Sequence, residues 1–311
     1  MITETEQEEY QALREGSGFV WHEDRALLRF SGPDAAKFLH NFCTANVNAL
    51  ESGDVTEGFV LDSRGKTISF GHILRLQQEI YWTAASKAHA EGLRAHFDKY
   101  IIREDVAVED VSNSYRARIA PLGKDVEPGD MNRCTVADGE GMITGCGELA
   151  GPCRFELLPT SEQDSSAETM GERSMECSLA ALEMVRLEYG TPWFGREVGD
   201  DNLPQELRRD EKAISFTKGC YLGQETVAKI DAIGHVNRFL VGLQLEPGTE
   251  SGAEITADDE KKIGELKSVA WSPALDGPIA LGFVKRQYSK TGSTLLIAGR
   301  PAEVAALPAI P

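Results

Sequence analysis

The 311-residue sequence predicts an α+β fold with a separate all-β part at the C-terminus. Over most of the chain, paired β-like runs alternate with single helical stretches, a pattern that favours α+β over a doubly wound parallel sheet. From Val236 onward no helical period remains, and short β-like runs separated by Pro, Gly and Asp predict a small antiparallel barrel. We therefore expect an α+β region at 1–235, with subdomains at about 19–112 and 113–235, and a barrel at 236–311.

The first elements follow from local composition. Residues 1–18 are polar and acidic and predict a loose arm, whereas residues 19–30 predict two strands paired around a turn. A helix should start at 31–34, because proline suits the first helical turn and aspartate suits its positive end. Phe38 and Phe42 would then lie on the buried face of this helix.

The middle of the chain predicts a meander of antiparallel strands over residues 54–84, with a turn at 62–65. A helix near 86–100 and a strand at 106–111 should follow. Gly190 stands where glycine commonly ends a helix. Beyond residue 111 we expect strands near 114–121 and 153–158 and helices near 161–171 and 178–189.

An excess of acidic residues excludes some classes of function. Asp and Glu number 50 against 32 Lys and Arg, and the net charge of −18 disfavours nonspecific binding to nucleic acid or to an anionic membrane. No apolar stretch approaches the ~20 residues of a membrane span, and the acidic start does not resemble a secretory signal, so we expect a cytoplasmic protein. The six cysteines form no CxxC pair, which predicts reduced thiols and no metal site.

The segment 218–225, KGCYLGQE, is the most unusual in the chain. Two glycines bracket Cys220 and Tyr221, and a helix should begin directly afterwards. The helix N-terminus and Lys218 would both favour the thiolate of Cys220, whereas Glu225 would oppose it. Two interpretations remain open, namely a nucleophilic thiol and a structural cysteine packed in a turn.

Glu188 is a second candidate, because it falls in the last turn of the helix predicted at 178–189. The helix dipole disfavours an anion there by ~0.3–1 kcal/mol, so the carboxylate needs a compensating partner. That partner is either a cation, such as Arg186, or a pair of N–H donors on a heterocyclic ligand.

Segment 218–225 resembles the signature of the YgfZ-type folate-binding proteins, which are related to the glycine-cleavage T-proteins, or aminomethyltransferases. Three other blocks are similar to the same superfamily: SGPDAAKFLHNFCTANVNALESGD, RLEYGTPWFGREVGDDNLPQE and IGELKSVAWSPALDGPIALGFV. One departure is Lys229, which stands where the family signature ends in arginine.

The resemblance implies a T-protein-like folate-binding fold of two intertwined α+β subdomains plus a C-terminal antiparallel β-barrel. It implies tetrahydrofolate or a related reduced folate as the ligand, with Glu188 holding the pterin ring. Because mitochondrial relatives of the family act in iron–sulfur cluster assembly, iron–sulfur client or assembly proteins are the implied partners. The site residues that it implies in segment 218–225 are the functional thiol Cys220 with Lys218, and the folate contacts Tyr221, Gln224 and Glu225.

The resemblance also bears on activity. T-proteins carry an acidic pair after a glycine turn, and the matching positions here are Ser69 and Phe70, neither of which can hold a negative charge. The leading hypothesis is a folate-binding protein that assists assembly or maintenance of iron–sulfur clusters in client enzymes. The alternatives are a tetrahydrofolate-dependent aminomethyltransferase and an interaction module with a vestigial pocket.

Overall fold

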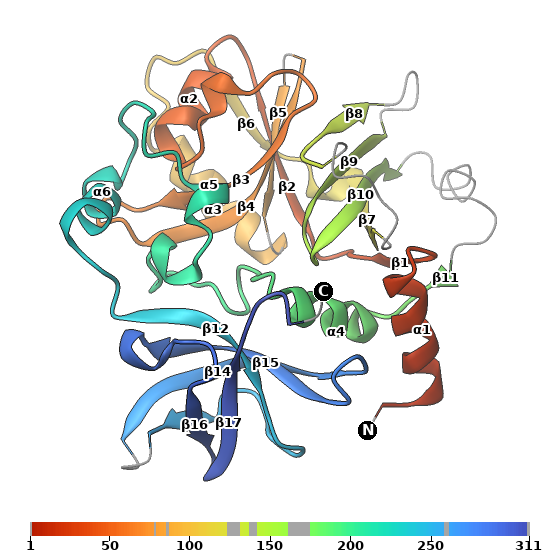
Figure 1. The fold of residues 1–311 in the computed structure, drawn as a ribbon. Coiled ribbons are helices and arrows are strands. Elements are labelled where there is room, and N and C mark those ends of the chain that lie inside the picture. The colour runs from red at the N-terminus through yellow and green to blue at the C-terminus, as the bar shows by residue number, and fades with distance from the viewer. Residues whose placement is uncertain are drawn as a thin grey trace.

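Three sheets make up most of the protein (Figure 1). The computed structural model describes residues 2–77, 79–84, 87–122, 131–136, 142–160, 175–257 and 261–309. Two of the sheets carry helices and form the α+β region, and the third closes into a C-terminal barrel. Helix α4 (Leu179–Tyr189) lies where the α+β region meets the barrel. The predicted T-protein-like α+β fold with a C-terminal antiparallel barrel is confirmed.

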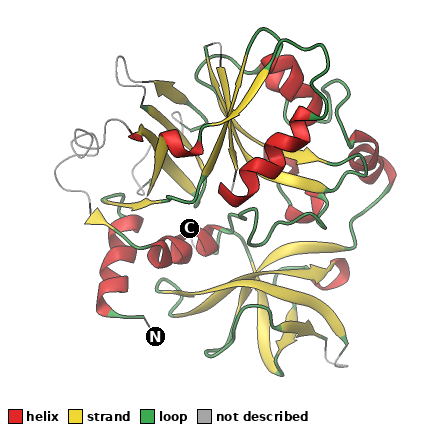
Figure 2. Ribbon diagram, turned by 180° about the vertical axis from the view of Figure 1, so that it is seen from behind, coloured by secondary structure: helices red, strands yellow, loops and turns green. Residues whose placement is uncertain are grey.

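The five-stranded sheet has the order β3-β4-β5-β2-β6. Helices α2 (Ala35–Phe42) and α3 (Lys87–Asp98) pack on one face of it, as Figure 2 shows from behind. Phe30 and Trp82 are fully buried beneath them. The meander predicted over 54–84 is confirmed. The strands are β3 (Val55–Leu61), β4 (Thr67–Leu76), β5 (Glu79–Ala84), β2 (Ala26–Ser31) and β6 (Ala107–Asp110).

The six-stranded sheet has the order β11-β1-β7-β10-β9-β8. Its first strand in the chain, β1, precedes the whole five-stranded sheet yet pairs with β7, so the two halves of the α+β region are intertwined. The strands are β1 (Gly18–Trp21), β7 (Tyr115–Pro121), β8 (Cys134–Val136), β9 (Ile143–Glu148), β10 (Pro152–Pro159) and β11 (Met175–Glu176).

The barrel closes in the order β12-β15-β14-β13-β16-β17. Alternate residues such as Val241, Leu243 and Leu266 fill its interior, which is the period-2 pattern read from the sequence. The strands are β12 (Arg238–Gln244), β13 (Glu254–Thr256), β14 (Lys262–Ser272), β15 (Gly277–Lys285), β16 (Thr294–Ile297) and β17 (Arg300–Ala305), with a 3₁₀ turn at Arg286–Tyr288.

Short elements connect α4 with the barrel: the 3₁₀ helix η6 (Pro204–Leu207), α5 (Asp210–Ala213) and α6 (Gln224–Ile233). Two further 3₁₀ turns, Val47–Ala49 and Ser112–Ser114, follow α2 and β6. Among the described helices, none combines the length and the apolar character needed to cross a membrane.

Two predictions near the N-terminus are wrong. Residues Glu4–Arg14 form helix α1 instead of a loose arm, because Thr3 and Glu6 cap it reciprocally and Tyr10 and Leu13 give it a buried face. The strands expected within 19–30 both form, but they belong to different sheets and do not pair with each other. The helix predicted near 161–171 lies outside the described residues.

Candidate functional site

Segment 218–225 forms a loop that leads into α6. Gly223, directly before the helix, has a φ of 81°, a left-handed conformation that glycine adopts without strain. A Cβ atom at this position would lie 2.6 Å from the carbonyl oxygen of Asp62, so glycine also lets the loop pack closely against the β3–β4 turn. A Cβ atom at Gly65 in that turn would likewise lie 2.6 Å from Thr226 of α6.

The ammonium group of Lys218 caps the C-terminal end of α2. Its Nζ donates to the carbonyl oxygens of His40, Cys43 (2.7 Å) and Ala45 (2.9 Å), so all three N–H groups are satisfied. Burial lowers the pKa of Lys218 to about 8. Its hydrogen bonds are thus made to main-chain carbonyls and not to the Cys220 thiol, which differs from the arrangement expected from the sequence.

The residues around Lys218 divide between the interior and the surface. Tyr221 is buried in an apolar cluster with Phe70 and Phe194, and the Lys218 ammonium lies 4.8 Å from its ring centre. Burial raises the pKa of Tyr221 to about 12. Gln224 is half-buried, whereas Cys220 and Glu225 are exposed to solvent.

The Glu188 carboxylate is fully buried in the last turn of α4. The Tyr10 hydroxyl donates to both of its oxygens at 3.0 Å, and the Ser272 hydroxyl donates to Oε1 at 2.5 Å. Burial raises the pKa of Glu188 above its ordinary value. The hydroxyl groups of Tyr10 in α1 and Ser272 in β14 thus donate the hydrogen bonds that the Glu188 carboxylate needs. The sequence analysis expected a cation or a heterocyclic ligand in this role. Arg186 instead binds Glu183 and Glu197.

The structure does not bring Glu188 and Cys220 into one site. Glu188 contacts α1 and the barrel strand β14, whereas the loop that carries Cys220 contacts α2 and the β3–β4 turn. In Figure 1, α1 and α6 lie on opposite sides of the molecule, with α4 between them.

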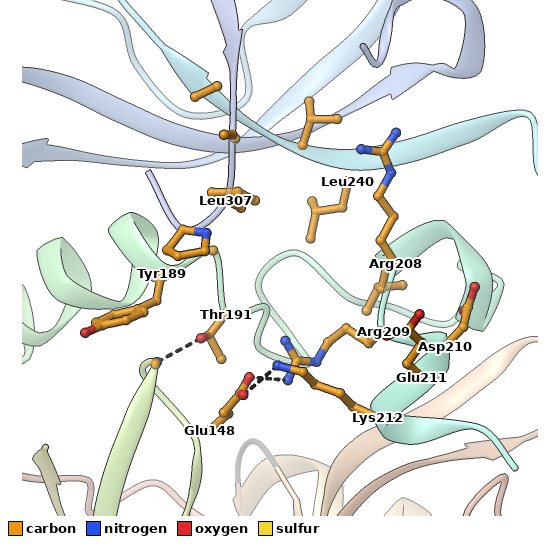
Figure 3. A pocket seen from close by; sticks show the side chains of 18 of the residues that line it. Glu148, Tyr189, Thr191, Arg208, Arg209, Asp210, Glu211, Lys212, Leu240 and Leu307 are labelled. Atoms are coloured by element: carbon orange, nitrogen blue, oxygen red, sulfur yellow. Dashed lines mark hydrogen bonds and ion pairs between the residues drawn. The ribbon is translucent and has the colours of Figure 1, made fainter. Parts of the chain in front are cut away.

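A cavity of about 740 Å³ opens where α4, α5 and the barrel meet (Figure 3). This volume is within the range of ~300–1,000 Å³ that is typical of small-molecule sites. Leu207 and Leu240 supply apolar surface to the lining, and charged side chains of α5 and β9 supply polar surface. Neither Glu188 nor segment 218–225 contributes to the described lining.

The segment after β17 forms one wall of this cavity. The Leu307 side chain fits against two glycines, since a Cβ atom would lie 2.5 Å from it at Gly190 and 2.7 Å from it at Gly242. The N–H group of Ala309 donates to the main-chain carbonyl of Glu188 at 2.7 Å. The barrel is therefore attached to the end of α4 by this segment.

An ion network forms the part of the cavity opposite the barrel. Glu148 of β9 accepts hydrogen bonds from Lys212 (2.5 Å) and Arg209 (2.9 Å). Arg209 also donates to Glu57 of β3, at 2.6 Å from its Nε atom. These contacts join both sheets of the α+β region to α5.

Glu57 and His72 are site residues that the sequence analysis missed. They face each other across β3 and β4, with 3.9 Å between His72 Nε2 and Glu57 Oε1. Burial lowers the pKa of His72 well below its usual range, and neither ring nitrogen has a hydrogen-bond partner among the residues that the structure describes. The alternation in the two strands, which places both residues on the same face as Phe59 and Phe70, is the signal that could have identified them.

Three charged side chains at the cavity, those of Arg208, Asp210 and Glu211, have no partner of opposite charge among the described residues. Arg208 donates to the Ser289 hydroxyl at 2.8 Å and lies 4.3 Å from the ring centre of Phe239, but it meets no carboxylate. The Asp210 carboxylate accepts no hydrogen bond within the described chain, and its Oδ1 atom is buried. In Figure 3 the Arg208 guanidinium points toward the barrel, away from Asp210 and Glu211.

Comparison with known proteins agrees with this architecture. Residues 2–120 match the GCVT N-terminal domain, and residues 238–310 match the glycine cleavage T-protein C-terminal barrel domain. The protein belongs to the aminomethyltransferase-like superfamily. It superposes on the glycine cleavage system aminomethyltransferase T from Bartonella henselae with a TM-score of 0.88 and 20% sequence identity, covering 98% of this chain and 89% of that one.

Relatives in this superfamily carry transferase names. A chloroplastic protein of Arabidopsis thaliana that is named as a transferase is 28% identical over 287 residues, which are 87% of this chain and 66% of the plant protein. The aminomethyltransferase of Cutibacterium acnes is 26% identical and matches 93% of this chain and 85% of its own length.

The two positions that the resemblance matches to the acidic pair of T-proteins, Ser69 and Phe70, are engaged in packing here. Ser69 accepts a hydrogen bond from Trp82 Nε1 at 3.1 Å, beneath the helices of the five-stranded sheet. Phe70 stacks on Phe59 with 4.6 Å between ring centres, on the opposite face. Glu57 lies on that same face, two residues before Phe59, and is the nearest carboxylate along β3.

Proposed function

We propose that the protein binds a reduced folate in the cavity between α5 and the barrel, and that it assists assembly or maintenance of iron–sulfur clusters in client enzymes. The observation that carries the first part is the 740 Å³ cavity in a fold of the T-protein superfamily. The second part rests on the resemblance of segment 218–225 to the YgfZ-type signature and on the exposure of Cys220.

The polar groups at the cavity suit a folate. A folate carries a pterin ring with hydrogen-bond donors and acceptors at one end and carboxylates at the other. Arg208, a cation without a carboxylate partner, suits an anionic group, and the leucines of the wall suit aromatic rings. Glu188 is closed off by Tyr10 and Ser272, so the proposed site does not use its carboxylate.

Cys220 lies outside the cavity lining, so the proposal separates the two functions in space. The folate would bind between the barrel and α5, and the thiol would meet a client or assembly protein at the surface loop. No group of three side chains suited to hold a metal ion gathers among the described residues. In this proposal the cluster belongs to the partner.

Aminomethyl transfer to tetrahydrofolate is a second candidate, because several relatives are named aminomethyltransferases. Ser69 and Phe70 argue against the standard reaction, since neither supplies a carboxylate. A transferase acting here would need another acid, and Glu57 is engaged with Arg209.

Calorimetric titration with 5-formyltetrahydrofolate tests the folate part, and we expect saturable binding with one site per chain. Turnover assays with an aminomethyl donor and tetrahydrofolate separate the two candidates, because we expect binding without turnover. Clear turnover would place the transferase first. Absence of binding would remove both.

The role of Cys220 is tested in cells that lack the protein. We expect the wild-type chain to restore the activity of iron–sulfur enzymes and Cys220→Ser to fail, while both bind the folate equally in vitro. Cys177→Ser is the matched control, because that thiol is buried. Full restoration by Cys220→Ser would overturn the proposed role of the thiol.

A further inference from the structure

The loop that carries Cys220 crosses the C-terminal end of α2 and is bonded to it on both sides of the thiol. Before the thiol, the N–H group of Ser215 donates to the carbonyl oxygen of Thr44 at 2.9 Å. After it, the N–H group of Leu222 donates to the carbonyl oxygen of Asn41, also at 2.9 Å. Among the described residues, no main-chain hydrogen bond holds the stretch between these two points to another element.

The two residues at the centre of this stretch have few contacts of their own. Cys220 is exposed, and a Cβ atom at Gly219 would meet no atom within 4 Å. The side chains on either side of them, Lys218 and Tyr221, are buried, with an exposed fraction of 8% each. The position of the thiol therefore depends on how these two neighbours are anchored.

The Lys218 ammonium group uses its whole hydrogen-bonding capacity at the end of α2. Its three N–H donors bind the carbonyl oxygens of His40, Cys43 and Ala45. A cation at this end of a helix also complements the helix dipole. With its donors used in this way, the lysine acts on Cys220 through the main chain that joins them.

We propose that Lys218 is a positioning residue, which holds Cys220 at the surface in the place where a client or assembly protein meets the thiol. This inference rests on the proposed function and adds to it the residue that fixes the geometry of the contact. It differs from electrostatic activation of the thiolate, in which the lysine charge would act on the sulfur directly.

Hydrogen exchange measures the position of the loop. Lys218→Met keeps most of the side-chain stem and removes the ammonium group, so we expect the amides of 215–222 to exchange at least about tenfold faster, the scale of one charge-assisted hydrogen bond. Strand β15 should keep its wild-type exchange rates. Lys267→Met removes a lysine that pairs with Glu265 on the barrel, and it should change neither region. Equal acceleration of the loop and β15 by Lys218→Met would make the lysine a residue of global stability and overturn the assignment.

Chemical rescue tests the three hydrogen bonds themselves. Lys218→Ala lacks three methylene groups and the ammonium group, which propylammonium replaces atom for atom. We expect propylammonium to slow exchange of the loop in this variant. Tetramethylammonium, a cation without N–H donors, should have no effect. Equal effects of the two cations on the loop would overturn the role of the hydrogen bonds.

The pH profile of Cys220 alkylation separates positioning from activation. We expect the same midpoint in the wild-type protein and in Lys218→Met, because the ammonium group binds carbonyl oxygens and not the thiol. A midpoint that rises when the ammonium group is removed would show that the lysine charge stabilises the thiolate, and the positioning role would then be wrong.

The functional test uses cells that lack the protein. Lys218→Met should restore several-fold less iron–sulfur enzyme activity than the wild-type chain, although Cys220 is still present. Its affinity for 5-formyltetrahydrofolate should be unchanged, because Lys218 does not contribute to the described cavity lining. Full restoration by Lys218→Met would overturn the inference. If the wild-type chain itself restores nothing, the proposed function fails, and the inference fails with it even where the exchange results hold.

Discussion

Lys218 and Cys220 are two residues apart in the chain, yet they belong to different environments. The lysine ammonium binds three carbonyl oxygens at the end of α2, and the thiol faces solvent. Because the two residues are close in the sequence, the lysine charge was expected to stabilise the Cys220 thiolate. The hydrogen bonds of Lys218 do not support this expectation. Burial, which the local sequence does not reveal, decides the chemistry of both side chains.

Cys220 should react with a thiol reagent faster than any other cysteine of the protein near pH 7. Burial shields four of the others and raises the pKa of their thiols to about 11 or 12, while Cys146 is half-buried. Timed alkylation with mass-spectrometric mapping measures the order. A map that places Cys220 among the slow thiols contradicts an accessible loop, and Cys220→Ser should remove the fast phase.

Glu188→Gln should change the pH dependence of stability. Because the folded-state pKa of Glu188 is raised, the wild-type protein is stabilised by this group below pH 4.5 and loses that contribution as the pH rises through the folded value. The variant lacks this loss, so the free energy of unfolding of the variant relative to wild type should increase from pH 4.5 to pH 7. Urea unfolding at both pH values checks this, with Tyr10→Phe as a control that keeps the carboxylate. Parallel pH profiles would exclude a buried ionising carboxylate.

At the scale of elements, the glycine at the end of α4 has two roles. Its backbone conformation ends the helix, and its lack of a side chain leaves room for another residue to pack. Gly190 ends the helix with a φ of 71° and leaves space for Leu307 from the segment after β17. The helix stop was predictable from the sequence, because a glycine follows the last periodic residue. The contact with Leu307 was not, because nothing local links residues that are far apart in the chain.

Gly190→Ala should destabilise the protein by about 1–3 kcal/mol, since alanine resists the left-handed conformation and its methyl group would overlap Leu307. Gly92→Ala is the matched control, because Gly92 lies inside α3 with nothing within 4 Å of the added methyl group. That change should stabilise the protein by about 0.5–1 kcal/mol. Denaturant unfolding measures both, and equal effects of the two substitutions would contradict the packing argument.

Elements that depend on local interactions were predicted correctly from the sequence, whereas contacts between distant residues were missed. The meander at 54–84, the helix near 178–189 and the C-terminal strands depend on local turns and periodicity, and they form. The partner of β1 depends on distant residues and was missed. The helix at 4–14 was also missed, although Thr3 and Glu6 form a local capping box at its start. The Tyr10 hydroxyl that satisfies Glu188 is 178 positions away in the chain, so no local pattern could have identified it.

For the whole molecule, a buried ion pair between Arg186 of α4 and Glu197, in the loop that follows α4, contacts the barrel through Ser268. Both side chains are fully buried, with two hydrogen bonds of 2.8 Å between them, and Ser268 of β14 also donates to Glu197. The main chain of Trp193 donates to the same carboxylate at 2.9 Å. We infer that the barrel and the α+β region unfold together, because separation would remove the Ser268 hydroxyl from this buried carboxylate.

Arg186→Met should therefore lower the free energy of unfolding by about 3–5 kcal/mol, the cost of leaving a buried charge unpaired. Arg94→Met, which breaks an exposed pair with Asp98 on α3, should change it by less than about 1 kcal/mol. Calorimetry of the full chain gives both values. A separate low-temperature transition for the barrel in the wild-type protein would argue against joint unfolding.

The accessible loop at Cys220 offers a practical advantage. Among six cysteines it alone is exposed, so a maleimide dye should attach at a single known position without any engineering. Such a label would stand beside α6, outside the cavity lining, and its emission would report movement of that surface loop when a binding protein docks.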